Sequence, residues 1–205
     1  MGRPRTNDAA VAERLVACAT ELFATRPQES VTVRALAAAA GTSTAAVYTL
    51  FQGKDGLIRE VRDQAVAGLF RELSAVPGSA AALDDLYALA VAYRHWGREH
   101  RHLYAVLFGG AQSFVPSDRV GDHDPVRPLV AAIDRAVADG VLAGDTTRIA
   151  VSLWVALHGL VTLELAGALE GAVAETAFRS TVDAVLRGWA APDVAPGFRR
   201  ADTAL

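Results

Sequence analysis

Apolar residues recur every three to four positions along nearly the whole chain, which is the spacing of one face of an α-helix. A first helix is expected at residues 8–25, followed by helices at about residues 33–40, 44–51, 54–75, 79–100, 102–108, 124–139, 146–165 and 173–189. No stretch keeps the alternation of apolar and polar residues that marks a half-buried strand. The pattern therefore predicts an all-α protein of about nine helices.

Two short helices near the N-terminus are bounded by residues with clear structural preferences. Thr32 and Ser43 precede them, and a hydroxyl at that place can accept a backbone N–H that the helix leaves unpaired. Gly41 lies between the helices and suits a left-handed backbone. Ala37 and Ala40 allow two helices to cross closely. The segment is therefore expected to form a helix-turn-helix.

The composition supports a folded, helical, cysteine-poor chain. Hydrophobic residues make up 52% of the 205 residues and charged residues 21%, which excludes a disordered tail protein. This hydrophobic content is sufficient for the buried core of one or two domains. Alanine occurs 42 times and aromatic residues are few, which favours helix over sheet. One cysteine excludes a disulfide framework and a zinc site built on cysteines.

The charge is unevenly divided. The net charge of -3 argues against nucleic acid when it is taken alone. However, residues 1–54 hold six basic and four acidic residues, and no carboxylate occurs between Glu29 and Asp55. Residues 55–205 hold 14 basic and 19 acidic residues. The acidic surplus therefore belongs to the C-terminal part, and the N-terminal part remains compatible with a polyanion.

Residues 8 to about 60 resemble the N-terminal helix-turn-helix of the TetR family of bacterial repressors. The matching positions are Leu36-Ala37, Ala40-Gly41, Ser43, Val47-Tyr48, Phe51, Lys54 and Leu57. Two positions depart from the common pattern, because Thr42 replaces an aliphatic residue and Leu50 replaces a histidine or another ring. These departures concern the operator sequence rather than the fold.

The resemblance implies that the helix at residues 44–51 lies in the major groove of DNA. Tyr48 and Lys54 would then contact phosphates, and Lys54 is the only lysine in the chain. Thr44 would contact a base edge, while Ala45 and Ala46 could touch a thymine methyl group. Taken singly, Tyr48 could equally be core packing and Lys54 a solvated surface charge.

Neighbouring residues extend this expected interface. Arg34 could contact a guanine or a phosphate, and Thr32 could add a phosphate contact, although Thr32 is more simply a cap. Arg3 and Arg5 could enter a minor groove or follow phosphates. The complete set of expected DNA-binding residues is Thr32, Arg34, Thr42, Ser43, Thr44, Ala45, Ala46, Tyr48, Thr49, Lys54, Arg3 and Arg5.

The chain divides by composition into four parts. We expect a flexible basic arm at residues 1–7, the helix-turn-helix domain at 8–54, an effector-binding and dimerisation domain at 55–190, and a tail at 191–205. The third part resembles a regulator subtype with a Trp followed by His-Gly in a late helix. Here these residues are Trp154 and His158-Gly159.

Rings on several helices predict an apolar pocket in that third part. The expected pocket residues are Tyr93, Trp96, Tyr104, Phe108, Trp154, His158 and Thr162. The same rings could instead belong to the hydrophobic core, and His158 could simply bind a backbone carbonyl.

The last two helices are the expected dimer surface. The residues assigned to it are Ala156, Leu160, Leu163, Gly167, Phe178, Val182, Val185, Leu186 and Trp189. A two-fold dimer would present two recognition helices about one DNA turn apart, which requires a palindromic operator.

These observations favour a dimeric TetR-like regulator, most often a repressor, that binds double-stranded operator DNA and is released by a small apolar or aromatic effector. The N-terminus shows no secretory signal, so a cytoplasmic location is expected. No cofactor, metal or catalytic residue is expected, because no phosphate-binding loop is present and His100 and His102 do not share a helix face. The apolar residues 149–169 leave an alternative, a helical small-molecule-binding or membrane-associated protein without DNA binding.

Overall fold

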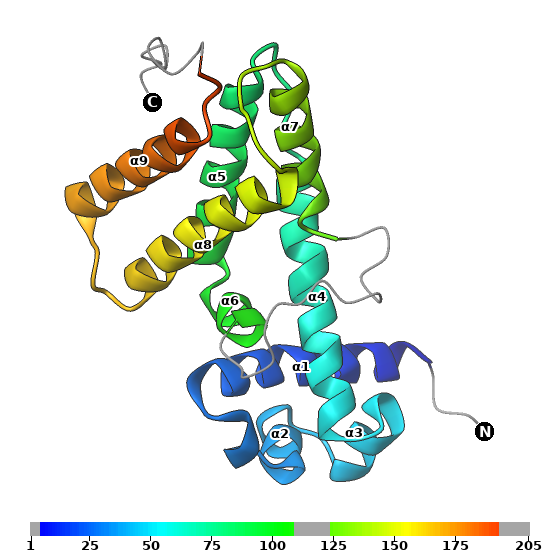
Figure 1. The fold of residues 1–205 in the computed structure, drawn as a ribbon. Helices are drawn as coiled ribbons and strands as arrows, with labels where there is room; N and C mark the ends of the chain where they lie inside the picture. The colour runs from blue at the N-terminus through cyan, green and yellow to red at the C-terminus, as the bar shows by residue number, and fades with distance from the viewer. Residues whose placement is uncertain (1–4, 109–123, 193–205) are drawn as a thin grey trace. The chain divides into compact units, whose positions relative to one another are not determined.

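The computed structural model describes residues 5–108 and 124–192, with side chains from residue 8 onward. These residues form only helices, turns and one isolated bridge between Leu142 and Ala190. The helices are α1 (Arg5–Thr25), α2 (Val33–Ala39), α3 (Thr44–Phe51), α4 (Lys54–Ser74), α5 (Ala82–Glu99), α6 (Arg101–Phe108), α7 (Arg127–Ala138), α8 (Thr146–Leu165) and α9 (Gly171–Gly188), with a short 3-10 helix at Gln28–Ser30 (Figure 1). The all-α prediction is confirmed.

The N-terminus of α1 differs from the sequence-based prediction. α1 begins at Arg5 rather than at residue 8, so the expected arm is already helical from Arg5 onward. The physical reason is that Pro4 is the last residue here that disfavours a helix interior. Arg3 lies outside the described residues. The helix therefore begins three residues earlier than predicted, and the flexible arm at residues 1–7 stays a prediction.

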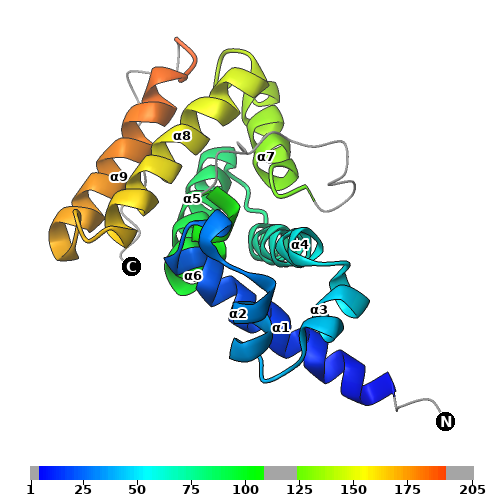
Figure 2. The ribbon, with the colours of Figure 1, turned by 90° about the horizontal axis from the view of Figure 1, so that it is seen from below.

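The first compact unit contains residues 1–68 and 100–124. Within it, α1 packs against α2, α3 and α6, and α2 packs against α3 (Figures 1 and 2). Leu15 of α1, Leu36 of α2 and Val47 of α3 are fully buried in one core with Leu57 of α4 and Val106 of α6. The core thus fixes the two short helices on α1, as the apolar stripes predicted.

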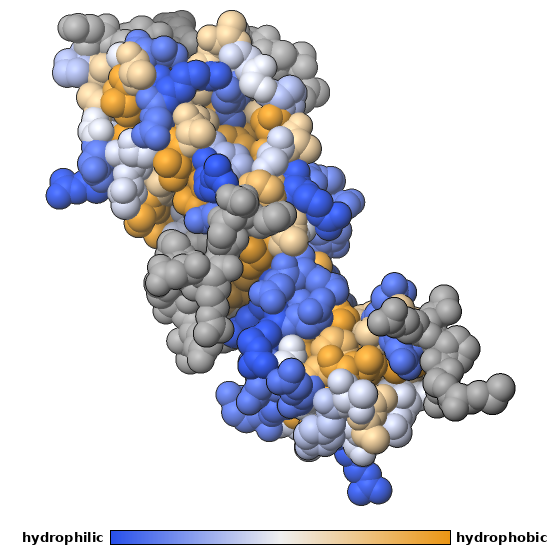
Figure 3. Space-filling model, turned by 90° about the vertical axis from the view of Figure 1, so that its right-hand side faces the viewer, coloured by the Kyte–Doolittle hydropathy of each residue, from blue (hydrophilic) through white to orange (hydrophobic). Residues whose placement is uncertain are grey.

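The second unit contains residues 69–99 and 125–205. Here α5 packs against α7 and α8, and α8 also packs against α7 and α9. Figures 1 and 2 both show α8 and α9 side by side. Trp96, Ile133 and Leu153 are among the largest fully buried side chains of this unit. Figure 3 shows hydrophilic side chains interspersed with smaller hydrophobic areas on one face of the molecule, as on most protein surfaces.

α8 is apolar enough, by length and composition, to cross a membrane, and one third of its most apolar window is buried inside the chain. One face of α8 holds Ile149, Leu153 and Leu157 in the core. On the opposite face, Val151, Val155 and Leu163 are each about half exposed. α8 is therefore buried on one face and exposed on the opposite face.

A buried cation joins three helices of the second unit. Arg94 of α5 is 9% exposed and donates from Nε and Nη2 to Glu164 of α8 at 3.0 and 2.5 Å. Its Nη1 donates to Glu175 of α9 at 2.7 Å. The guanidinium also lies over the ring of Phe178, 4.6 Å from its centroid. These contacts tie α5, α8 and α9 together.

Candidate nucleic-acid interface

α2 and α3 are held in place by the two predicted caps. The Thr32 hydroxyl accepts the backbone N–H of Ala35 at 3.1 Å, and the Ser43 hydroxyl accepts that of Ala46 at 3.2 Å. Gly41 between the helices has a φ of 61°, a left-handed value that side chains disfavour. The local geometry of the helix-turn-helix therefore follows directly from residue types at its ends.

One face of α3 is exposed and uncharged. Val47 is fully buried, whereas Thr44, Ala45, Tyr48 and Thr49 are exposed, and Tyr48 is 59% exposed. This exposure excludes the interpretation of Tyr48 as core packing. Short or neutral side chains on one face allow a close approach to another molecule, and none of them would repel phosphate.

The remaining predicted residues of this region differ in exposure. Arg34 on α2 and the caps Thr32 and Ser43 are exposed, whereas Thr42 and Ala46 are half-buried. Arg5 begins α1, although its side chain is not described. Arg34 therefore adds a cation beside the exposed face, while Thr42 and Ala46 offer less surface than expected.

The end of α3 is shaped by two residues with positive φ. Gln52 has a φ of 61°, the only positive value of a non-glycine among the described residues, and its N–H donates to Tyr48 O at 2.9 Å. Gly53 has a φ of 109°, and a Cβ there would lie 3.4 Å from the Tyr48 ring. The backbone of Gly53 thus packs directly beneath the exposed tyrosine and helps to orient its ring.

Lys54 has a structural partner that the sequence did not reveal. Its Nζ donates to the backbone carbonyl of Gln28 at 3.0 Å, so the first residue of α4 is joined to the turn between α1 and α2. The residues are 26 positions apart, and no local signal marks Gln28 as an acceptor. Lys54 is half-buried, which excludes the interpretation as a fully solvated surface charge.

The predicted pocket residues are divided between the two units. Tyr104 and Phe108 belong to the first unit, with ring centroids 4.6 Å apart, and the other five belong to the second. Tyr93, Trp96 and Tyr104 are at most 5% exposed. A cavity of about 520 Å³ in the second unit is lined instead by Val91, Arg94, His95, Arg98 and Glu99 of α5. None of the seven predicted residues is among these five.

Trp154 and His158 lie on the same face of α8. Their rings stack with centroids 5.6 Å apart and an interplanar angle of 23°, as expected for positions four apart on a helix. Both are half-buried, while Thr162 is exposed. Burial lowers the pKa of the His158 imidazole, so this ring is neutral at pH 7.

Three of the predicted dimer residues are already covered within the single chain. Phe178, Val182 and Leu186 are at most 2% exposed within the single chain, and Phe178 packs edge-on against Tyr87. Their apolar stripe faces the chain's own core and is therefore not available to a second copy. Leu160 is also buried, whereas Leu163 and Gly167 are exposed and Ala156, Val185 and Trp189 are half-buried. Sequence periodicity identifies an apolar face but not what covers it.

The described residues contain no group of three or more potential metal ligands.

Comparison with known proteins gives a consistent result. Residues 15–61 match the family model of bacterial regulatory proteins of the tetR family, and residues 86–187 match a tetracyclin repressor-like C-terminal domain. The HTH-type transcriptional regulator Rv0681 of Mycobacterium tuberculosis is 28% identical over 163 residues, which cover 78% of this chain and 71% of the relative.

Solved structures share the fold. A putative tetR family transcription regulator from Shewanella has a TM-score of 0.74 at 15% identity, covering 88% of this chain and 98% of that one. The TetR family regulator PfmR from Thermus thermophilus has a TM-score of 0.69 at 24% identity, covering 85% and 97%. Together with the capped helix-turn-helix and the all-helical second unit, these matches show that the chain belongs to the TetR family of transcription regulators.

Proposed function

We propose that this regulator is a dimeric repressor that binds a palindromic operator through α3 and is released by a small effector. The observation that carries the proposal is the exposed, uncharged face of α3, held between a capped start and a fixed end. A helix presented in this way can enter the major groove, where base edges differ in their donors and acceptors.

The residues of α3 and its surroundings divide by chemistry. Thr44 and Ala45 are exposed at the N-terminal end of α3, the end that recognition helices direct at base edges. Tyr48, Thr49 and Arg34 suit phosphate contacts. Lys54 uses one of its three ammonium donors for Gln28, which leaves donors for a phosphate. Its bond to Gln28 would hold that charge at the N-terminus of α4.

The proposed dimer surface is the uncovered face of α8. Val151, Val155, Gly159 and Leu163 follow one another at intervals of four residues, and all four are exposed. A Cβ on Gly159 would meet nothing within 4 Å, so no contact inside the chain explains a glycine in this helix. A glycine costs roughly 1 kcal/mol against alanine in a helix interior, and close approach of a second helix would justify that cost.

For the effector we propose the second unit as the binding region, with the half-buried Trp154–His158 stack as an aromatic contact. A neutral imidazole and an indole suit an apolar or aromatic molecule. Effector and operator would weaken each other's binding by the same factor, because binding linkage is reciprocal.

The test of the DNA interface compares two substitutions by gel shift on the chain's own promoter and on randomised sequences. Lys54→Ala should weaken binding to all sequences by a similar factor, since a phosphate contact carries no sequence information. Thr44→Val should change the preferred base, at a cost of about 1–3 kcal/mol for the wild-type site.

Thr25→Val, an exposed threonine on α1, is the matched control and should change neither property. Unchanged selectivity in Thr44→Val would show that Thr44 does not read a base. Binding that does not weaken with rising salt would contradict phosphate contacts altogether.

We further propose that the protein acts in the cytoplasm, without catalysis and without a membrane. The apolar outer face of α8 is the observation that favours the other candidate, association with a membrane. Sedimentation with phospholipid vesicles separates the two. A regulator should remain in the supernatant as a dimer, whereas a membrane-associated protein should pellet and fail to shift promoter DNA.

A further inference from the structure

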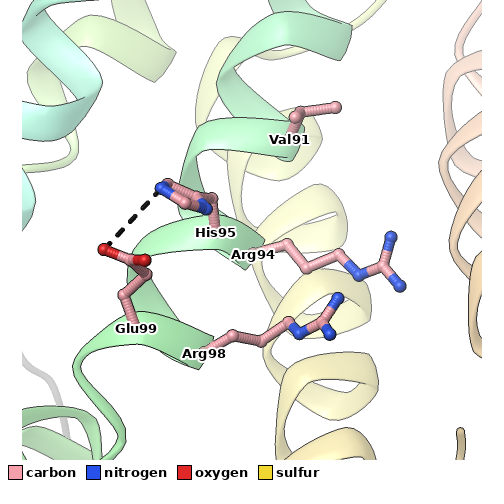
Figure 4. A pocket seen from close by; sticks show the side chains of 5 residues that line it. All are labelled: Val91, Arg94, His95, Arg98 and Glu99. Carbon is pink, nitrogen blue, oxygen red and sulfur yellow. Dashed lines mark ion pairs between the residues drawn. The ribbon is translucent and has the colours of Figure 1, made fainter. Parts of the chain in front are cut away.

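The cavity on α5 lies on successive turns of a single helix. This cavity is a hollow of about 520 Å³ that is open to solvent and is lined by Val91, Arg94, His95, Arg98 and Glu99 (Figure 4). Cavities of roughly 300–1,000 Å³ hold small organic molecules. The lining is polar, unlike the aromatic lining that the sequence predicted, so the ligand chemistry has to be argued from these five residues.

Two guanidinium groups dominate one side of the cavity. Arg94 and Arg98 are four residues apart, and Figure 4 shows their side chains extending to the same side, while His95 and Glu99 lie together elsewhere. Like charges at this spacing repel each other. Arg94 and Arg179, which pairs with Glu175 at 2.7 Å, together balance the charges of Glu164 and Glu175. Among the described residues, Arg98 makes no ion pair, so its charge remains available to an anion.

Arg94 is held rigidly at the wall of the cavity. Its bonds to Glu164 and Glu175 raise its pKa and use three of its five N–H donors. One hydrogen on each terminal nitrogen therefore remains. A buried, fixed guanidinium loses little entropy when it donates another bond, while the exposed Arg98 can close over a ligand from its own turn.

The rest of the lining suits a molecule with an apolar body. Val91 is 38% exposed one turn before Arg94. The imidazole of His95 lies 3.9 Å from the carboxylate of Glu99, and Figure 4 shows these two side chains on the other side of α5 from the two arginines. The cavity thus offers an anion-binding side and an adjoining apolar surface.

We propose that this cavity binds a small organic acid, with its carboxylate on Arg98 and Arg94 and its hydrocarbon part against Val91. The idea that this acid is the effector rests on the proposed function, whereas the binding itself does not. Because Arg94 also holds Glu164 of α8 and Glu175 of α9, an anion on its two remaining hydrogens would lie beside these carboxylates and repel them. Through Arg94 and Glu164, the proposed ligand site is therefore connected to α8, the helix of the proposed dimer.

The test uses the full chain without DNA, titrated calorimetrically with benzoate and hexanoate and with the uncharged benzamide and hexanamide. Both carboxylates should bind, and both amides should bind at least about tenfold more weakly, because hydrogen bonds between a guanidinium and a carboxylate are stronger than those to an uncharged amide. Arg98→Gln should lose about tenfold or more for the carboxylates only. Inorganic phosphate, which lacks a hydrocarbon part, should bind more weakly than either acid.

Arg187→Gln, an exposed arginine at the end of α9, is the matched control and should bind like the wild type. Circular dichroism verifies that both variants are folded. Absence of carboxylate binding, equal binding of acids and amides, or wild-type affinity in Arg98→Gln would each overturn the proposal. None of these results bears on the promoter gel shift, so failure here is distinguishable from failure of the proposed DNA binding.

Discussion

At residue scale, Gly56 in the first turn of α4 lies in close backbone contact with Phe51 at the end of α3. A Cβ at this position would lie 1.6 Å from the carbonyl oxygen of Phe51, and the obstacle is backbone rather than a mobile side chain. The contact fixes the chain at the point where the exposed face of α3 ends. Only glycine allows it.

We therefore expect Gly56→Ala to lower the free energy of unfolding by more than about 2 kcal/mol, since two backbone segments must separate. Urea denaturation followed by circular dichroism measures the change. Gly188→Ala is the control, because Gly188 lies in a helix and nothing is within 4 Å of an added Cβ there. Equal stability of the two variants would mean that α4 can move away from Phe51 at little cost.

Lys54 shows what residue type can and cannot predict. Its place in the motif predicted a cation near DNA, and the structure adds a bond from Nζ to the carbonyl of Gln28. That bond depends on the path of the chain between α1 and α2, which is a short 3-10 helix that periodicity did not predict. The local motif therefore predicted a role for Lys54 but did not reveal this contact.

At the scale of elements, the Arg94 cluster determines how α8 and α9 are attached to α5. Glu164 is 7% exposed at its side chain, so removal of its partner would leave a carboxylate buried without a counter-ion. The partner of this carboxylate lies 70 residues earlier in the chain. Long-range ion pairs of this kind have no sequence signature.

Arg94→Met is expected to destabilise the chain by roughly 3–5 kcal/mol, the usual cost of breaking a buried pair from one side. Arg179→Met removes the other cation at Glu175, from an exposed position, and should have little effect. Thermal unfolding compares the two variants with the wild type. A mild effect of Arg94→Met would show that water reaches Glu164 more easily than its burial suggests.

The same cluster gives a pH dependence. Hydrogen bonds from Arg94, and then from Arg179, lower the pKa of Glu175 below its ordinary value of 4.5. This carboxylate therefore stabilises the fold above that ordinary value, and the contribution is lost as pH falls through the lower folded-state pKa. Below about pH 4.5, the free energy of unfolding should therefore fall less steeply in the Glu175→Gln variant than in the wild type. Parallel curves would contradict this assignment.

At the scale of the whole molecule, the proposed dimer depends on the outer face of α8. Val155 is 56% exposed, and Val155→Glu should prevent two copies from associating, because it would bury a charge at the contact. Light scattering should then report a monomer, and circular dichroism should report an unchanged helix content. Ala131→Glu, at an exposed position of α7, is the control and should remain a dimer. A dimeric Val155→Glu variant would place the interface elsewhere.

The sequence predicted more of the fold than of the sites. Helices, the caps Thr32 and Ser43 and the left-handed Gly41 depend on neighbours within about four residues, so their residue types were sufficient. The exposed face of α3 followed from the same periodicity. Phe178 and Val91 show the limit, because the first was expected on the surface and the second lines an unexpected cavity.

By itself, the sequence determined an all-α chain with an acid-free helix-turn-helix, since propensity, capping and local charge are properties of short segments. The TetR family followed from the resemblance of that motif. Only the tertiary structure decided that Lys54 is joined to Gln28, that Arg94 links three helices, and that the cavity of the second unit is lined by arginines. The first two of these features join residues 26 and 70 or more positions apart. Their distances are set by helix packing, which depends on the whole core rather than on any one segment.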